Sequence, residues 1–319
     1  MTEIQFIAPG CGETLRENRA EGILTSDSGV VFPIIRGIPV LIGDCELRER
    51  IAFSNWHQES PDTLDAGTFY NRLDNQDAYC REQLSESRLL ISNFLSQNQL
   101  SGHVLEIGSG KGPLQGIGGD DYVALDFSLT ALERFIDVRY QRVCASAEQL
   151  PFSDESLRFI FSVATLEHVP NAAAVFSEIH RTLKPGGMLF LLPAWHCEQY
   201  NCEGIPVRNY NELSWRQCVT KFMLPLYRSP LYKAFRSVPW RAYRRALFFL
   251  RNKPTELKFD RLKPDYSRFW LSDSDAACRI DTHEAALFFS SRKYRILAPG
   301  ASLLRQLLAR HVPLVATKP

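Results

Sequence analysis

The central part of the chain alternates between short apolar runs and longer stretches in which apolar residues recur every three or four positions. Short apolar runs are typical of buried parallel strands, and the longer spacing is typical of amphipathic helices. The pattern predicts strands at 103–107, 121–125, 141–144, 159–163, 188–192, 294–297 and 313–316. It predicts helices over 78–99, 128–136, 172–183 and 283–289. We therefore expect an α/β fold in which helices cover both faces of a mostly parallel sheet.

The pattern changes on either side of this region and predicts three parts. Residues 1–43 form a small β module, with two short strands around Arg36-Gly37. Residues 44–77 are polar and rich in turn residues, which is typical of a linker with short helices. Residues 78–319 form the main domain, which carries a helical insertion over 195–281.

A glycine-rich turn follows the first central strand. Glu106 is the acid in the run Val104–Ile107, and Gly108, Gly110 and Gly112 follow the run at alternate positions. Glycine lets the backbone adopt positive φ angles and lets a ligand approach the main chain. Asp126 ends the next strand 20 residues after Glu106, the spacing at which a carboxylate reaches ribose hydroxyls in nucleotide-binding α/β folds. An acid before the first glycine would repel a pyrophosphate, so the pattern favours a ligand with a cationic group.

This pattern resembles the first motif of the class I S-adenosylmethionine-dependent methyltransferases (type 11-like domain), E/D-x-G-x-G-x-G. The resemblance continues in Ala145–Phe152, Leu166–Val169 and Leu183–Gly187. It implies a Rossmann-like sheet of seven strands, S-adenosylmethionine as cofactor and methyltransferase activity.

The resemblance also implies which residues bind the cofactor. Glu106 and the Gly108–Gly112 backbone would hold its methionine end, and Asp126 its ribose. Phe127 would flank the adenine, while Ser146, where the family usually has aspartate, would contact the adenine edge. The predicted cofactor-binding residues are Glu106, Gly108, Ser109, Gly110, Gly112, Asp126, Phe127, Ser146, Ala147 and Glu148.

Two histidines are candidate catalytic residues. His168 and His196 both follow predicted strand ends, and ligands of parallel sheets bind at the carboxyl ends of strands. Imidazole titrates near neutral pH, so either side chain could accept a proton from a hydroxyl acceptor. A nitrogen acceptor could dispense with a base.

The N-terminal module resembles the zinc-ribbon modules that activate, or are fused to, methyltransferases. The resemblance lies in Phe32–Leu41, where those modules end in Y-P-I-x-x-G-I-P-x-L. Their four zinc-binding cysteines correspond to positions 8, 11, 25 and 28, of which only Cys11 is a cysteine. We therefore predict no metal site, and a module held by packing on its neighbour.

Charge is distributed unevenly along the chain. The net charge is +1, but residues 205–268 contain 15 Lys and Arg against four Asp and Glu. Within this segment, 227–251 interleaves basic residues with aromatic and aliphatic ones. Such a stretch suits a membrane interface or a surface for a phosphorylated substrate, and nucleic acid is a weaker alternative. A helical lid with a solvated basic face would have the same composition.

These observations leave three functions open. The first is O-methylation of a small-molecule, glycan or lipid-linked acceptor. The second is methylation of RNA or protein, and the third is a non-catalytic partner or scaffold. The eight cysteines show no disulfide framework and no signal peptide is evident, so we expect a cytoplasmic protein, peripheral at the inner membrane surface if 227–251 contacts lipid.

Overall fold

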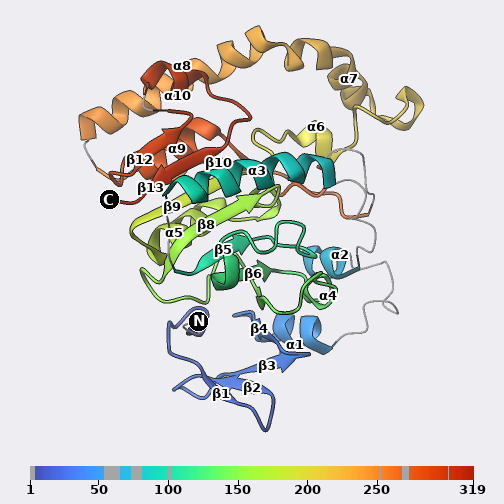
Figure 1. The fold of residues 1–319 in the computed structure, drawn as a ribbon. Coiled ribbons are helices and arrows are strands. Elements are labelled where there is room, and N and C mark those ends of the chain that lie inside the picture. Colours follow the sequence, from blue (N-terminus) through green and yellow to red (C-terminus); the bar gives the residue numbers. More distant parts are fainter. Residues whose placement is uncertain are drawn as a thin grey trace. The chain divides into compact units, whose positions relative to one another are not determined.

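The computed structural model describes residues 4–53, 65–72, 81–98, 102–251, 253–267, 273–300 and 302–319, and Figure 1 shows the course of the chain. The chain divides into two compact units. Unit 1 comprises residues 1–165, 174–191 and 318, and unit 2 comprises residues 166–173, 192–317 and 319.

Unit 1 is built on a mainly parallel sheet with five central strands. These strands are β5 (Val104–Ile107), β6 (Tyr122–Asp126), β7 (Gln141–Ala145), β8 (Leu157–Val163) and β9 (Leu183–Leu192). They lie in the order β7-β6-β5-β8-β9, with β5 parallel to β6 and β8, and β6 parallel to β7. All four residues of β5 are buried, because this strand has neighbours on both edges and apolar side chains on both faces. The predicted α/β class with a mostly parallel sheet is confirmed.

The helices of unit 1 lie largely where the periodicity predicts them. They are α1 (Cys45–Phe53), α2 (Ala66–Arg72), α3 (Arg81–Asn98), α4 (Leu129–Glu133) and α5 (Ala172–Thr182), with a 3-10 turn, η1, at Gly119–Asp121. Ser128 caps α4 by accepting a hydrogen bond from Ala131 N. Parts of the predicted linker and of the helix after it, 54–64 and 73–80, lie outside the described residues.

The N-terminal module extends the same sheet. Its strands are β1 (Arg16–Asn18), β2 (Ile23–Thr25), β3 (Val31–Ile35) and β4 (Ile38–Leu41), which pair antiparallel in sequence order. Arg36 and Gly37 both have positive φ angles, 50° and 76°, as a tight hairpin turn between β3 and β4 requires. β4 then runs parallel to β7, with Val40 opposite Cys144. Each of the seven predicted strands corresponds to an observed strand, but the count differs in detail, because the four strands of the module join the same sheet at its β7 edge.

The boundary of β9 also differs from the prediction. The pattern predicts a helix that ends at 183 and a strand that begins at 188, but β9 begins at Leu183 and includes Lys184-Pro185-Gly186-Gly187. Backbone groups of Lys318 bond with this segment: Gly186 N donates to Lys318 O (3.1 Å), and Lys318 N donates to Gly187 O (2.8 Å). A distant residue thus supplies the hydrogen bonds that keep the proline–glycine segment extended.

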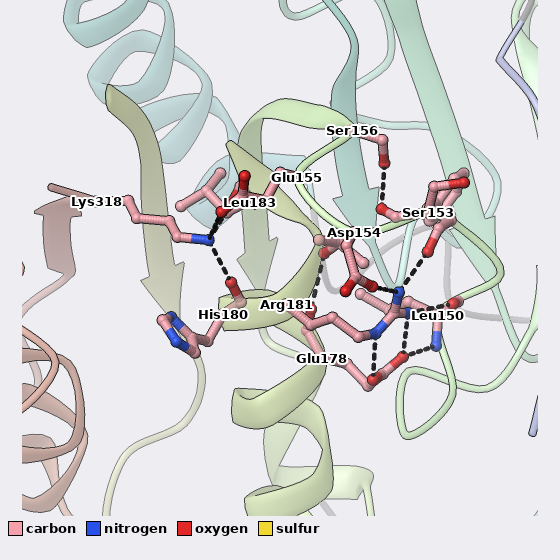
Figure 2. Close-up of polar contacts among 12 residues, drawn as sticks. Leu150, Ser153, Asp154, Glu155, Ser156, Glu178, His180, Arg181, Leu183 and Lys318 are labelled. Carbon is pink, nitrogen blue, oxygen red and sulfur yellow. Dashed lines mark hydrogen bonds and ion pairs between the residues drawn. The ribbon is translucent and has the colours of Figure 1, made fainter. Parts of the chain in front are cut away.

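Two cations, half-buried Arg181 and buried Lys318, fix the end of α5 (Figure 2). Arg181 donates to both carboxylate oxygens of Glu178, to Asp154 Oδ1 and to the carbonyls of Leu150 and Phe152, at 2.7–2.9 Å. Lys318 Nζ donates to the carbonyls of His180 (2.9 Å), in the last turn of α5, and Leu183 (2.6 Å), just beyond it. These bonds tie α5 to the loop that follows β7.

Replacement of Arg181 by alanine should lower the free energy of unfolding by about 2–4 kcal/mol, because Glu178 and two carbonyls each lose a hydrogen-bond partner in a half-buried place. Urea unfolding followed by circular dichroism measures the change. Arg139→Ala is the matched control, since Arg139 pairs with the nearby Asp137 and its side chain is 80% exposed. A loss no larger than that of the control would contradict the role assigned to Arg181.

Unit 2 contains the 22-residue helix α8, further helices and two short antiparallel strand pairs. Its helices are η2 (Leu166–His168), α6 (Gln199–Cys202), η3 (Tyr210–Glu212), α7 (Trp215–Arg228), α8 (Pro230–Arg251), α9 (Thr282–Ser290) and α10 (Leu303–Leu308). Its strands are β10 (Phe259–Arg261), β11 (Cys278–Ile280), β12 (Arg295–Ala298) and β13 (Leu314–Thr317), paired β10 with β11 and β12 with β13. α9 is the core helix of the unit: eight of its nine residues are buried, and Asp281 caps it by accepting from His283 N. Residues 252 and 268–272 of the predicted insertion lie outside the described residues.

Candidate functional site

The glycine-rich turn after β5 folds back on the end of β6. Gly108 N and Ser109 N both donate to Leu125 O, at 2.8 and 3.0 Å. Gly108 has a φ angle of 78°, and a Cβ built there would lie 2.1 Å from Thr165 Oγ1. Only glycine fits this position without displacing Thr165.

Gly110 differs from Gly108 in its surroundings. Its φ angle is 51°, and a Cβ built there would meet no atom within 4 Å. Its N–H donates to Asp126 Oδ2 at 2.7 Å. The turn therefore presents main chain to open space directly beside a carboxylate.

Asp126 ends β6 and orders the two loops around it. Oδ1 accepts from Ser128 N at 2.8 Å, while Oδ2 accepts from Gly110 N. Each carboxylate oxygen can accept a second hydrogen bond, so capacity remains for a ligand hydroxyl. Burial raises the pKa of Asp126, although the backbone N–H groups of Ser128 and Gly110 oppose that effect.

Glu106 is 2% exposed, and its Oε2 accepts a hydrogen bond from the Tyr122 hydroxyl. Burial raises the pKa of Glu106 to about 8, and the Asp126 carboxylate adds to the rise. The side chain is therefore protonated at neutral pH until a cation or further donors reach it. Tyr122 had no role in the sequence analysis, since nothing in its local pattern shows that it bonds Glu106.

The other predicted cofactor residues lie at the ends of neighbouring strands. β5, β6 and β7 are parallel neighbours, so Glu106, Asp126 and Ser146 are at or just beyond the carboxyl ends of strands at one edge of the sheet. Phe127 is half-buried. Ser146 Oγ accepts from Glu148 N at 3.2 Å, which makes the hydroxyl part of the local turn, and Ala147 is buried between them.

The groups around the turn fit S-adenosylmethionine. Two carboxylates suit an ammonium and ribose hydroxyls, and the turn at Gly110 leaves room for a ligand. Ser109 Oγ is buried and has no hydrogen-bond partner among the described residues, so a further donor or acceptor is available. These groups belong to the predicted cofactor-binding residues. The structure adds Tyr122, whose hydroxyl bonds Glu106.

The two candidate histidines belong to unit 2. His168 lies in η2, with Nδ1 3.2 Å from Asp275 Oδ2 and Nε2 3.8 Å from Glu167 Oε1. Burial opposes protonation of the imidazole, but the carboxylates of Glu167 and Asp275 outweigh it and raise the pKa of His168. A histidine oriented by a carboxylate can accept a proton and stabilise the resulting imidazolium.

His196 has a different environment. Its Nδ1 is 3.9 Å from Asp281 Oδ2, a carboxylate that already accepts from Arg241 Nε at 3.1 Å. Burial lowers the pKa of His196 to about 3, and the positive charge of Arg241 adds to this effect. His196 is therefore neutral at physiological pH and a much weaker proton acceptor than His168.

Unit 2 also contains a cavity of about 440 Å³ that the sequence analysis did not find. His196 and Trp240 line it together with five basic and four acidic residues, Lys233, Arg236, Lys258, Arg279, Arg310, Glu198, Asp260, Asp281 and Glu284. Arg236 and Arg279 share the Glu198 carboxylate, and Arg279 also bonds Asp260. By contrast, Lys233 forms no ion pair within the part of the chain that the structure describes, and Arg310 Nε is buried without a hydrogen-bond partner there.

Lys233 and Arg310 indicate which kind of ligand group the cavity could bind. Burial lowers the pKa of Lys233, and the nearby guanidinium of Arg310 lowers it further. Two cations that repel each other beside a cavity would both be stabilised by an anion. The cavity can therefore accept a phosphate or carboxylate group.

Comparison with known proteins agrees with the geometry of unit 1. A family model of a methyltransferase domain matches residues 105–191. A malonyl-acyl-carrier protein O-methyltransferase from Marinomonas sp. is 36% identical over 94 residues, which cover 26% of this chain and 35% of that protein. A sterol 24-C-methyltransferase from Schizosaccharomyces pombe is 29% identical over 75 residues, 24% of this chain and 20% of that protein. Among solved structures, phosphoethanolamine N-methyltransferase 2 from Haemonchus contortus has a TM-score of 0.38 and 18% identity, over 50% of this chain and 44% of that one.

Residues 105–191 are thus a methyltransferase domain of the class that uses S-adenosylmethionine. The predicted enzyme class and cofactor are confirmed for this domain. The chain spans about a third of the length of the malonyl-acyl-carrier protein relative that it matches. No helix in the described part of the chain is long and apolar enough to cross a membrane.

Proposed function

We propose that this chain is an S-adenosylmethionine-dependent O-methyltransferase, and that the predicted residues of unit 1 bind its cofactor. The observation that carries the proposal is the set of groups around the glycine turn: Glu106, Asp126, the unpartnered Ser109 hydroxyl and the open space at Gly110. The match of residues 105–191 to the methyltransferase domain supports it.

When bound, S-adenosylmethionine supplies a methyl group on a sulfonium, which needs no further activation for in-line displacement. The protein then has to bind the cofactor, align the acceptor with the methyl group and exclude water. Glu106 would hold the ammonium and Asp126 the ribose hydroxyls. Phe127 would flank the adenine, and Ser146, Ala147 and Glu148 would lie at its edge.

We assign the role of general base to His168 rather than His196. The carboxylate of Asp275 orients His168 and favours its protonated form, so it can remove a proton from an acceptor hydroxyl. His196 stays neutral because its pKa is about 3. The names of the curated relatives include both O- and C-methyltransferases, so the choice of oxygen as acceptor atom rests on His168.

The acceptor is a small molecule, glycan or lipid-linked compound in this proposal, and it carries an anionic group. We propose the anionic group because Lys233 and Arg310 line the cavity of unit 2 and could pair with it. A screen with methyl-labelled S-adenosylmethionine should compare phosphate- or carboxylate-bearing acceptors with uncharged analogues. Transfer to RNA or protein instead would favour the second of the three functions.

Calorimetric titration with S-adenosylmethionine tests the cofactor site. We expect micromolar binding that strengthens as the pH rises from 6 to 8, because an ammonium beside Glu106 would ionise a group whose pKa is about 8 and release its proton. The affinity should increase up to tenfold per pH unit and level off above pH 8. In Glu106→Gln the pH dependence should be reduced to that of the ligand itself, while Asp120→Asn at an exposed position should behave as wild type.

The same carboxyl group makes stability depend on pH. The pKa of Glu106 is raised from 4.5 in the unfolded chain to about 8 in the fold, so its contribution to stability is fully present below pH 4.5 and is lost as the pH rises through 8. Relative to Glu106→Gln, the wild type should lose up to about 1.4 kcal/mol of stability per pH unit over that range.

In the calorimetric titration, no binding heat at millimolar S-adenosylmethionine would refute the enzyme proposal. It would favour the third function, a non-catalytic partner or scaffold.

A further inference from the structure

α7 exposes one apolar face to solvent. Trp215, Val219, Phe222 and Leu226 are all exposed, and their spacing of four, three and four residues places them on a single side of the helix. Trp215 is 73% exposed and Phe222 75%. The fold leaves a stripe of large side chains uncovered, where a water-facing helix would normally carry polar residues.

α8 continues this exposed surface. Unlike a typical helix at a protein surface, it exposes large apolar side chains and buries basic ones. Its exposed side chains include Leu231 (84%) and Phe235 (80%), and further along Tyr243, Phe249 and Leu250. Its buried residues are two arginines, Arg241 and Arg245. We call the exposed apolar residues of α7 and α8 the apolar face.

The buried arginines explain why α8 has this orientation. Arg241 donates to Asp281 and to Leu307 O, and Arg245 donates to Gln306. Half-buried Arg244 forms a bidentate pair with Glu284 at 2.9–3.2 Å. These charge-assisted bonds hold the basic side of α8 against unit 2 and turn its aromatic side outward.

The charge around the apolar face indicates what covers it. α7 and α8 together contain nine Lys and Arg and no Asp or Glu. Arg216, Arg228 and Arg251 are exposed beside the apolar residues. Two copies of such a surface would repel each other, whereas anionic lipid headgroups would be attracted.

The residue types and dimensions also favour a membrane over a protein groove. The helices are 14 and 22 residues long, or roughly 21 and 33 Å. Tryptophan, tyrosine and arginine beside leucine and phenylalanine are typical of helices that lie in the headgroup region. We propose that α7 and α8 bind the surface of an anionic membrane through the apolar face, with the flanking arginines on lipid phosphates.

Vesicle co-sedimentation of the full chain tests the proposal. We expect binding to vesicles of phosphatidylcholine with about a third phosphatidylserine, much weaker binding to phosphatidylcholine alone, and a decrease with salt. The double variant Phe222→Glu/Phe235→Glu should bind at least tenfold more weakly. The control Phe53→Glu/Ile136→Glu makes the same change at exposed apolar positions outside the apolar face and should bind as wild type.

Thermal unfolding should show that both double variants remain folded, since all four positions are exposed. Absence of vesicle binding by the wild type would overturn the proposal, as would binding that Phe222→Glu/Phe235→Glu leaves unchanged. Size-exclusion chromatography tests whether a second copy of the chain covers the apolar face instead. A wild-type dimer that this variant converts to monomer, without vesicle binding, would assign the apolar face to a second copy of the chain.

Discussion

Replacing Asp126 by alanine is expected to weaken S-adenosylmethionine binding by at least a hundredfold. Asp126 is the only acid at the end of β6, and its two oxygens already organise Gly110 and Ser128. The variant would lose the proposed bonds to the ribose and also the bond that holds the glycine turn. Hydrogen bonds to a charged group contribute about 1.5–3 kcal/mol each, so two of them account for this loss.

Titration calorimetry measures the effect, with Asp126→Asn as the matched control. The amide keeps one carbonyl oxygen and the size of the side chain, so it should lose less affinity than alanine. Thermal unfolding should show a folded Asp126→Ala variant, because the carboxylate is costly to bury and its removal compensates in part for the lost bonds. Wild-type affinity in Asp126→Ala would remove Asp126 from the cofactor site.

The predicted cofactor residues could be identified from the sequence because they lie close together in it. Glu106, the glycine turn and Asp126 belong to one strand–turn–strand unit, and parallel pairing of β5 with β6 brings their ends to one edge. The local pattern therefore contains most of the site. Tyr122 belongs to the same unit, but its hydroxyl contact with Glu106 depends on side-chain orientation, which periodicity does not determine.

The errors concern contacts between distant segments. β4 pairs with β7, about 100 residues further on, so the strand count could not be read from either segment alone. The segment at Gly186-Gly187 is extended because Lys318 bonds to it. In α8 the periodicity shows an apolar and a basic side, but which side is buried depends on Asp281, Glu284 and Gln306.

Alanine at Gly108 and at Gly110 should separate the folding role of the glycine turn from its binding role. Both positions have positive φ angles, so alanine costs about 1 kcal/mol of backbone strain at either. At Gly108 the new Cβ would also lie 2.1–2.6 Å from the Oγ1, Cγ2 and Cβ atoms of Thr165. Gly108→Ala should therefore lower the free energy of unfolding by about 3 kcal/mol or more, since overpacking adds to the strain.

Gly110→Ala should reduce cofactor affinity more than stability. Its Cβ meets no protein atom within 4 Å, so the free energy of unfolding should fall only by the strain of about 1 kcal/mol. If the open space beside Asp126 is where the cofactor lies, the same methyl group should reduce S-adenosylmethionine affinity at least tenfold in a protein that is still folded. Urea unfolding and titration calorimetry on both variants give the four values required. Equal losses of stability would refute the contact with Thr165, and unchanged affinity in Gly110→Ala would place the cofactor elsewhere, because a methyl group in its binding space cannot be neutral.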